Sequence, residues 1–342
     1  MRTHGGNIYN STEMLDFSAN INPIGMPDSV YHAIIRSAAD CVHYPDPDCV
    51  KLTTALTDYE HIAPAQIVCG NGAADLIDRI VRAFRPERAL FCAPTFSEYA
   101  YALQGVGCET REFALAPEHN YQLTDGFLSA ISDDLDMVFL CTPNNPTGQR
   151  IPAALLYMIA DKCRQYGILL VSDECFLRFS EDAERYSLRP FLYENCIILN
   201  AFTKLYAIPG LRLGYALCGC AGSAERIRQT GQFWSVSVPA QAAGIAALQE
   251  PDWVSKTVRY VAAERQFLTD ELRQAGLTVY DSSANFLLIK APADFADRMK
   301  KHNIIVRRCE DFSGLTDEHF RIAVRTHAEN HALTAAVREE YK

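Results

Sequence analysis

Residues 199–215 have the sequence LNAFTKLYAIPGLRLGY, and this stretch decides how the rest of the chain is interpreted. The apolar run at 196–199 (CIIL) predicts a short buried strand, and a polar turn follows it. Thr203, Lys204 and Arg212 therefore fall near one strand end. An amine, a hydroxyl and a guanidinium in this arrangement would suit an aldehyde with a phosphate tail. Taken alone, the stretch is equally compatible with a solvated turn.

Composition and charge narrow the class of protein. The chain has 342 residues, a net charge of −10 and 49% hydrophobic residues, which is typical of a globular enzyme with one large or two unequal domains. The negative charge disfavours nucleic acid and anionic membranes as partners. No membrane-length apolar run and no signal-peptide core are present, and the twelve cysteines include no Cys-x-x-Cys pair. These features predict a soluble, cytoplasmic protein with reduced thiols.

Apolar runs alternate with amphipathic helical segments through the first two thirds of the chain. The predicted strands are residues 66–69, 89–92, 136–141, 167–172 and 196–199. Such alternation predicts an α/β fold with a mostly parallel sheet and helices on both faces. In these sheets ligands bind at the carboxyl ends of the strands, where residues 70–74, Phe96, Asn145, Asp173 and Lys204 all fall. Their coincidence favours one ligand site over five separate turns.

The glycine turn after the first of these strands predicts an anion site. Residues 66–75 pass from an apolar strand through Gly70 and Gly72 into a helical pattern, so the first amides of the helix face a ligand. Asp75 stands where a dinucleotide fingerprint would have its third glycine. The sequence therefore favours an anion site of another kind over an NAD site.

Three parts of the chain are expected. Residues 1–40 should form an N-terminal arm and a first helix that pack with the smaller domain, 41–240 a large domain, and 241–342 a small C-terminal α/β domain. His327 and His331 have the i, i+4 spacing of metal ligands on the last helix. No third ligand accompanies them, so a solvated helix face is favoured and no metal site is predicted.

Four motifs together resemble the fold-type I pyridoxal-phosphate (PLP) enzymes of the aspartate aminotransferase superfamily. They are residues 142–148 (TPNNPTG), 173–174 (DE), 203–204 (TK) and 210–215 (GLRLGY). Within this superfamily the chain is similar to histidinol-phosphate aminotransferases, and closer still to the threonine-phosphate decarboxylases of cobalamin biosynthesis. The second comparison depends on residues 4–8 (HGGNI), 16–27 (DFSANINPIGMP) and 204–210 (KLYAIPG).

The resemblance implies PLP as the cofactor and a role for each matching residue. Lys204 should bind the aldehyde as a Schiff base, and Asp173 should pair with the pyridine nitrogen. Asn145 should donate to the phenolic oxygen while Phe96 stacks on the ring. The cofactor phosphate should contact Gly72, Ala73, Ala74, Thr203, Arg212 and, from the other subunit of a homodimer, Tyr44. Phe176 stands where many aminotransferases have a tyrosine, although the decarboxylases also have phenylalanine there.

The implied activity is decarboxylation of O-phospho-L-threonine to (R)-1-amino-2-propanol phosphate, with O-phospho-L-serine as a second substrate. Arg325 matches the superfamily arginine that binds the substrate anion. The expected substrate-binding residues are His4, Gly5, Asn20, Asn145, Arg307, Arg321 and Arg325. Two alternatives stay open, an aminotransferase of the histidinol-phosphate type and a non-catalytic PLP-sensing regulatory domain. The second would normally carry a DNA-binding module, and this chain has no basic N-terminal extension to supply one.

Overall fold

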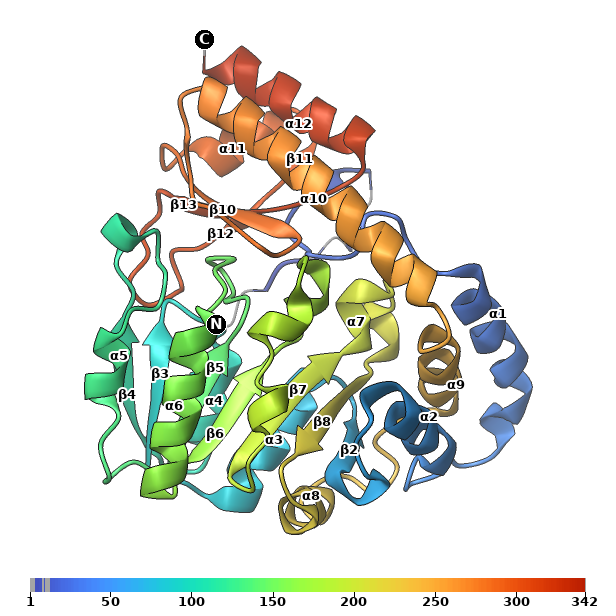
Figure 1. The fold of residues 1–342 in the computed structure, drawn as a ribbon. Coiled ribbons are helices and arrows are strands. Elements are labelled where there is room, and N and C mark those ends of the chain that lie inside the picture. Colours follow the sequence, from blue (N-terminus) through green and yellow to red (C-terminus); the bar gives the residue numbers. More distant parts are fainter. Residues whose placement is uncertain (1–3, 8, 10–12, 342) are drawn as a thin grey trace.

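A seven-stranded sheet forms the centre of the larger body in the computed structural model, which describes residues 4–7, 9 and 13–341 (Figure 1). Its strand order is β2-β8-β7-β6-β5-β3-β4. The strands are β2 (Ile67–Gly70), β3 (Arg88–Ala93), β4 (Glu109–Ala114), β5 (Met137–Cys141), β6 (Leu169–Asp173), β7 (Cys196–Ala201) and β8 (Gly214–Cys218). Strand β8 runs in the direction opposite to that of the other six strands. The predicted mostly parallel sheet is thus confirmed.

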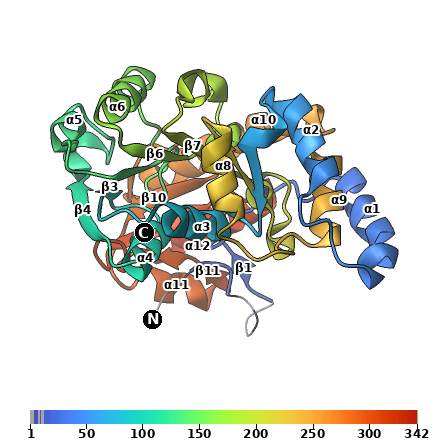
Figure 2. The same cartoon turned by 90° about the horizontal axis from the view of Figure 1, so that it is seen from below.

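Helices cover both faces of this sheet, as Figure 2 shows from below. One face packs against α3 (Ala73–Phe84), α4 (Glu98–Gly105) and α8 (Ala221–Arg228). The other face packs against α2 (Val50–Glu60), α5 (Gly126–Ala130) and α6 (Ala153–Tyr166). Every residue of β5 and β6 is buried, as expected for central strands that are covered on both sides.

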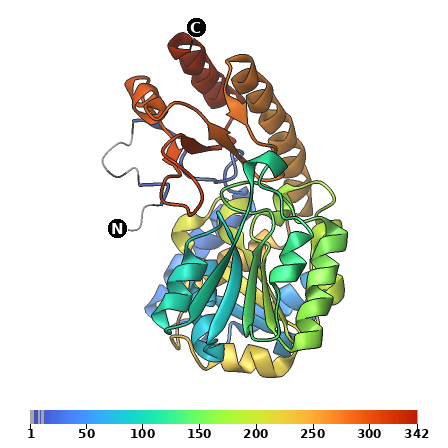
Figure 3. The same ribbon diagram turned by 90° about the vertical axis from the view of Figure 1, so that its left-hand side faces the viewer.

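A smaller layer lies above the carboxyl ends of the large sheet, and Figure 3 shows it from the side. Its four-stranded sheet has the order β12-β13-β10-β9. These strands are β9 (Thr278–Val279), β10 (Phe286–Lys290), β12 (Arg307–Arg308) and β13 (His319–Ala323). The helices of this layer are α10 (Pro251–Gln274), α11 (Phe295–Lys301) and α12 (His327–Glu340). None of the helices in the described ranges is long and apolar enough to cross a membrane.

The N-terminal arm and the first helix lie in different places. Strand β1 (Leu15–Asp16) pairs in parallel with β11 (Ile304–Ile305), which joins the arm to the smaller layer as expected. Helix α1 (Asp28–Ser37) packs against α9 (Val238–Ala247), beside α2 (Figure 1). Small residues on α9 (Ala240, Ala243, Gly244 and Ala247) are buried, and a Cβ on Gly244 would lie 2.9 Å from the side chain of Leu52 in α2. Most of α9 falls within 241–342, so α1 packs against residues that the sequence assigned to the small domain.

Candidate active site

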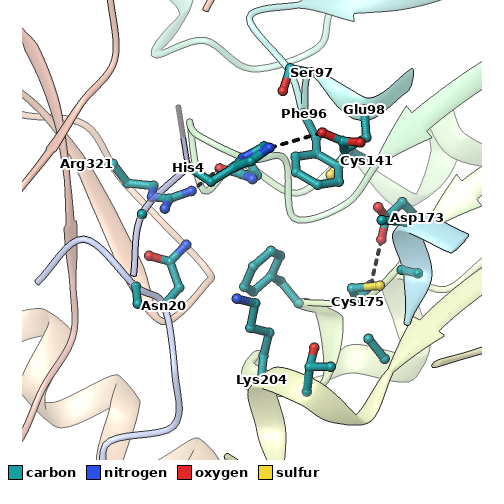
Figure 4. A pocket seen from close by; sticks show the side chains of 18 of the residues that line it. His4, Asn20, Phe96, Ser97, Glu98, Cys141, Asp173, Cys175, Lys204 and Arg321 are labelled. Atoms are coloured by element: carbon teal, nitrogen blue, oxygen red, sulfur yellow. Dashed lines mark hydrogen bonds and ion pairs between the residues drawn. The ribbon is translucent and has the colours of Figure 1, made fainter. Parts of the chain in front are cut away.

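A cavity of about 420 Å³ lies where the arm, the smaller layer and the carboxyl ends of the large sheet meet. Thirteen of the predicted site residues line it. They are His4, Gly5, Asn20, Ala73, Ala74, Phe96, Asn145, Asp173, Thr203, Lys204, Arg212, Arg307 and Arg321. Figure 4 shows ten labelled side chains around this cavity, among them Lys204 and Asp173. Residues separated by up to about 300 positions in the sequence are thus gathered around one space.

Lys204 lies on α7 (Phe202–Leu205), a single helical turn directly after β7. Burial, together with the nearby charges of Arg321 and Arg212, lowers the pKa of its amine to about 8. The backbone is fixed by the amide of Asn22, which donates to the Lys204 carbonyl at 3.0 Å. A substantial share of the amine is therefore neutral, and nucleophilic, near neutral pH.

Asp173 ends β6 and is 5% exposed. Its Oδ2 accepts a hydrogen bond from the Tyr99 hydroxyl at 2.7 Å, and its Oδ1 accepts one from the amide of Cys175 at 3.0 Å. Burial, with the charge of Asp173, raises the pKa of Tyr99 well above its usual value, so the phenol stays a donor. Tyr99 stacks on Phe139 with ring centroids 4.9 Å apart, which holds the hydroxyl in place.

The turn between β2 and α3, which the sequence predicts as an anion cradle, lies against Arg212. Gly72 has a φ of 88°, and a Cβ at this position would lie 2.6 Å from Nη2 of Arg212. Gly214 is equally constrained, since a Cβ there would lie 2.9 Å from the amide nitrogen of Ala73. The two glycines let the N-terminus of α3, the guanidinium of Arg212 and the strand β8 approach closely. Amides and a guanidinium at a helix N-terminus suit a phosphate group.

Arg321 and Asn20 supply unsatisfied polar atoms to the cavity. Arg321 donates to Oδ1 of Asn145 and, at 2.9 Å, to the carbonyl of Ser18. Among the described residues, Nε of Arg321 and Oδ1 of Asn20 are buried without a hydrogen-bond partner. Burial lowers the pKa of Arg321 to about 10, which still leaves it charged at neutral pH. Unpaired buried groups of this kind indicate a position for a ligand.

Three predicted residues are not among those that line the cavity. Gly72 acts through its missing side chain, as described above. Arg325 pairs with Glu329 at 2.5 Å, one turn into α12, whereas Arg321, four residues earlier, lines the cavity. Tyr44 is 77% exposed and stacks on Trp234 with ring centroids 4.2 Å apart.

The lining also contains residues that the sequence did not single out for roles. Glu98 bonds His4, Ser18 holds Arg321, and Cys175 bonds Asp173. Glu98 and Tyr99 lie two and three residues after Phe96, so proximity to a predicted site residue was the only local signal for them. Phe176 lines the cavity, as its position after Asp173 suggests.

The donor set of the cavity fits PLP. A buried amine with a lowered pKa, a buried carboxylate, an aromatic side chain and an anion cradle correspond to its aldehyde, pyridine nitrogen, ring and phosphate. Lys204, Asp173 and Phe96 would hold the first three groups, and Ala73, Ala74, Thr203 and Arg212 would hold the phosphate. No metal-binding residues are needed for this set.

Comparison with known proteins decides the family. The family model described as aminotransferase class I and II matches residues 12–337. The chain belongs to this family. This membership confirms the predicted fold, the predicted enzyme class and PLP as the cofactor of this chain.

Individual relatives agree with this membership. The chain is 39% identical to threonine-phosphate decarboxylase of Salmonella typhimurium (strain LT2), over 98% of this chain and 95% of that protein. The histidinol-phosphate aminotransferase structure from Clostridium acetobutylicum has a TM-score of 0.90 at 26% identity, covering 96% of this chain and 99% of that one. The enzyme of that name from Sinorhizobium meliloti, in complex with PLP, has a TM-score of 0.83 at 26% identity, covering 94% and 89%.

Proposed function

We propose that this protein is a PLP-dependent decarboxylase of O-phospho-L-threonine, which yields (R)-1-amino-2-propanol phosphate for cobamide biosynthesis. The observation that carries the proposal is a second set of anion-binding groups in the cavity, apart from the cofactor cradle. His4, Arg307 and Arg321 come from the arm and the smaller layer, whereas Ala73 and Arg212 come from the larger body, at the start of α3 and just before β8. The similarity to the Salmonella decarboxylase over nearly the whole of both chains supports the same substrate.

PLP, when bound, would accept electrons from the bond that breaks at the substrate α-carbon, and Asp173 would keep the pyridine nitrogen protonated. The contacts that the protein makes with the substrate would determine which bond at the α-carbon breaks. An aminotransferase holds the α-carboxylate near the ring plane, so that the Cα–H bond breaks. Cations that hold the substrate phosphate instead, here Arg321 and Arg307, leave the carboxylate free to turn out of the plane. Lys204 then returns a proton to the α-carbon from Nζ.

Arg321 is proposed as the main phosphate-binding arginine, in place of Arg325. Its guanidinium is buried in the cavity lining and has Nε unpaired among the described residues. Arg307 contributes charge, although its Nη2 also binds the Asp311 carboxylate at 2.6 Å. O-phospho-L-serine lacks only one methyl group, which an apolar contact distinguishes by about 1–3 kcal/mol. It is therefore proposed as a slower second substrate.

A cytoplasmic homodimer is also proposed. All twelve cysteines are free thiols, which suits a reducing compartment. Tyr44, Phe233 and Trp234 are 77%, 67% and 47% exposed, and exposed aromatic groups of this size favour a subunit contact. A partner subunit at this surface would explain why Tyr44 lies away from the cavity of its own chain.

The product formed from O-phospho-L-threonine tests the activity. Decarboxylation should release one carbon dioxide per substrate, need no keto-acid acceptor and leave the cofactor as PLP. Unphosphorylated threonine should be turned over poorly, because it lacks the group that Arg321 and Arg307 bind. Conversion of the cofactor to pyridoxamine phosphate with the carboxylate retained would instead establish the aminotransferase, the second candidate that the Clostridium structure favours.

A further inference from the structure

One carboxylate of the cavity lining fixes a histidine of the N-terminal arm. Nε2 of His4 lies 3.0 Å from Oε1 of Glu98, the first residue of α4. The Glu98 side chain is 13% exposed and that of His4 is 48% exposed, so the carboxylate lies inside and the imidazole lies over it. Figure 4 shows this pair beside the ring of Phe96. Both members line the same cavity as Lys204.

The backbone around His4 is held separately from its ring. A Cβ on Gly5 would lie 2.0 Å from the carbonyl oxygen of Ser18, so only glycine fits there. The amide of Gly6 donates to Oγ of Ser18 at 2.8 Å, and the Ser18 carbonyl accepts from Arg321. The arm is therefore anchored on the residue that also holds the proposed phosphate-binding arginine. Ser18 fixes the backbone next to His4, and Glu98 fixes the orientation of the His4 ring.

Glu98 is unexpected in a cavity that binds anions. A phosphate monoester carries a charge of about −1.5 to −2 near neutral pH, and a nearby carboxylate repels it. The repulsion between this carboxylate and the substrate phosphate must therefore be offset by a favourable contribution of Glu98 to substrate binding. A hydrogen bond at one imidazole nitrogen fixes the orientation of the ring and the role of the other nitrogen. Holding His4 in this way is the effect that Glu98 can supply.

We propose that Glu98 is a positioning residue for the phosphorylated substrate. It accepts a hydrogen bond from Nε2 of His4 and thereby turns the Nδ1 side of the ring toward the substrate phosphate. The proposal rests on the proposed function, because it requires a substrate with an anionic tail. It also assigns the arm a part in specificity for phosphorylated over unphosphorylated amino acids.

Replacement of Glu98 separates this role from simple electrostatics, because the two make opposite predictions. If Glu98 only repelled the substrate, Glu98→Ala would lower KM for O-phospho-L-threonine. If it positions His4, Glu98→Ala should raise KM about tenfold, the effect of losing one charge-assisted hydrogen bond, with kcat changed less than about twofold. Glu98→Gln keeps an acceptor oxygen and should recover most of the affinity.

The experiment uses the PLP-loaded protein. Steady-state kinetics with O-phospho-L-threonine would be measured for Glu98→Ala, Glu98→Gln, His4→Ala and the double variant. The double variant should be no worse than His4→Ala, since residues that act as a pair are not additive. Glu109→Gln, which removes a surface carboxylate near Arg111, is the matched control and should leave KM unchanged. A lowered or unchanged KM in Glu98→Ala would overturn the proposal.

Calorimetric titration with inorganic phosphate distinguishes failure of this inference from failure of the proposed function. If the wild type does not decarboxylate phosphothreonine but Glu98→Ala still weakens phosphate binding, the function is wrong and the positioning role stands. If decarboxylation is normal and phosphate binding is unaffected by Glu98→Ala, the positioning role is wrong. Should Glu98→Ala fail to fold, Glu98→Gln decides, because any fall of KM in that variant contradicts the proposal.

Discussion

At Lys204, burial and the charges of Arg321 and Arg212 all lower the pKa of the amine. Its pKa, lowered to about 8, means that the fraction of neutral amine rises steeply between about pH 7 and about pH 9. We expect the protein freed of cofactor to capture PLP faster as the pH rises, with a midpoint near pH 8 by stopped-flow absorbance. Arg321→Gln should move this midpoint upward, because the charge of Arg321 helps to lower the pKa. An unchanged midpoint would mean that burial alone sets it.

Covalent attachment tests the same residue directly. Borohydride reduction of the PLP-loaded protein should fix the cofactor on Lys204, as peptide mass spectrometry would show. Lys204→Ala should remain folded and lose the label, since no other lysine lines the cavity among the described residues. A label on Lys162, which bonds the Leu128 carbonyl, or on any other lysine would contradict the assignment of the site.

Asp173 should govern turnover more than cofactor binding. Asp173→Asn keeps the size of the side chain and removes the charge that pairs with the pyridine nitrogen. We expect PLP to stay bound by absorbance, while kcat falls about 10²–10³-fold, the usual effect of losing one preorganised electrostatic contact. Asp161→Asn, at a surface pair with Arg164, is the control. Wild-type turnover in PLP-loaded Asp173→Asn would reduce Asp173 to a structural role.

At the scale of elements, the turn from β2 to α3 depends on a glycine for two separable reasons. Gly72→Ala would place a methyl group against Arg212 and also force a residue with a side chain to a φ of 88°. Gly107→Ala, at a φ of 77° with nothing within 4 Å, meets only the second cost, about 1 kcal/mol. Both variants should therefore lose some thermal stability by circular dichroism. Only Gly72→Ala should also bind PLP more weakly in a fluorescence titration, and equal PLP affinity would remove Arg212 from the cradle.

At the scale of the whole molecule, the proposed dimer makes Tyr44 a residue of the partner's site. Sedimentation should give twice the chain mass of 38.2 kDa. Tyr44→Ala and Lys204→Ala should each be nearly inactive at limiting PLP. Mixing them after dissociation should restore about a quarter of the wild-type sites, because half of the dimers then hold one intact site. No recovery on mixing, with hybrid dimers present, would show that Tyr44 serves its own chain or none.

The sequence by itself determined five of the seven strands of the large sheet and the positions of Asp173 and Lys204 near its carboxyl edge. Continuous apolar runs gave strands whose observed bounds differ from the expected ones by a few residues, because central strands are buried on both faces. Asp173 directly follows such a run and Lys204 lies in the single helical turn after another, and the carboxyl ends of parallel strands meet at one edge. Local pattern was sufficient for these residues, since each is positioned by the strand that precedes it.

Only the tertiary structure decided which distant side chains meet. Arg321 and Arg325 share the two-residue period of an extended chain, so the sequence could not separate them. β13 ends at Ala323, which leaves Arg321 paired across the sheet with Arg307 and frees Arg325 to bind Glu329. The packing of α1 on α9, the Tyr99–Asp173 bond and the His4–Glu98 pair are of the same kind. Each depends on contacts between segments far apart in the chain, which no local period encodes.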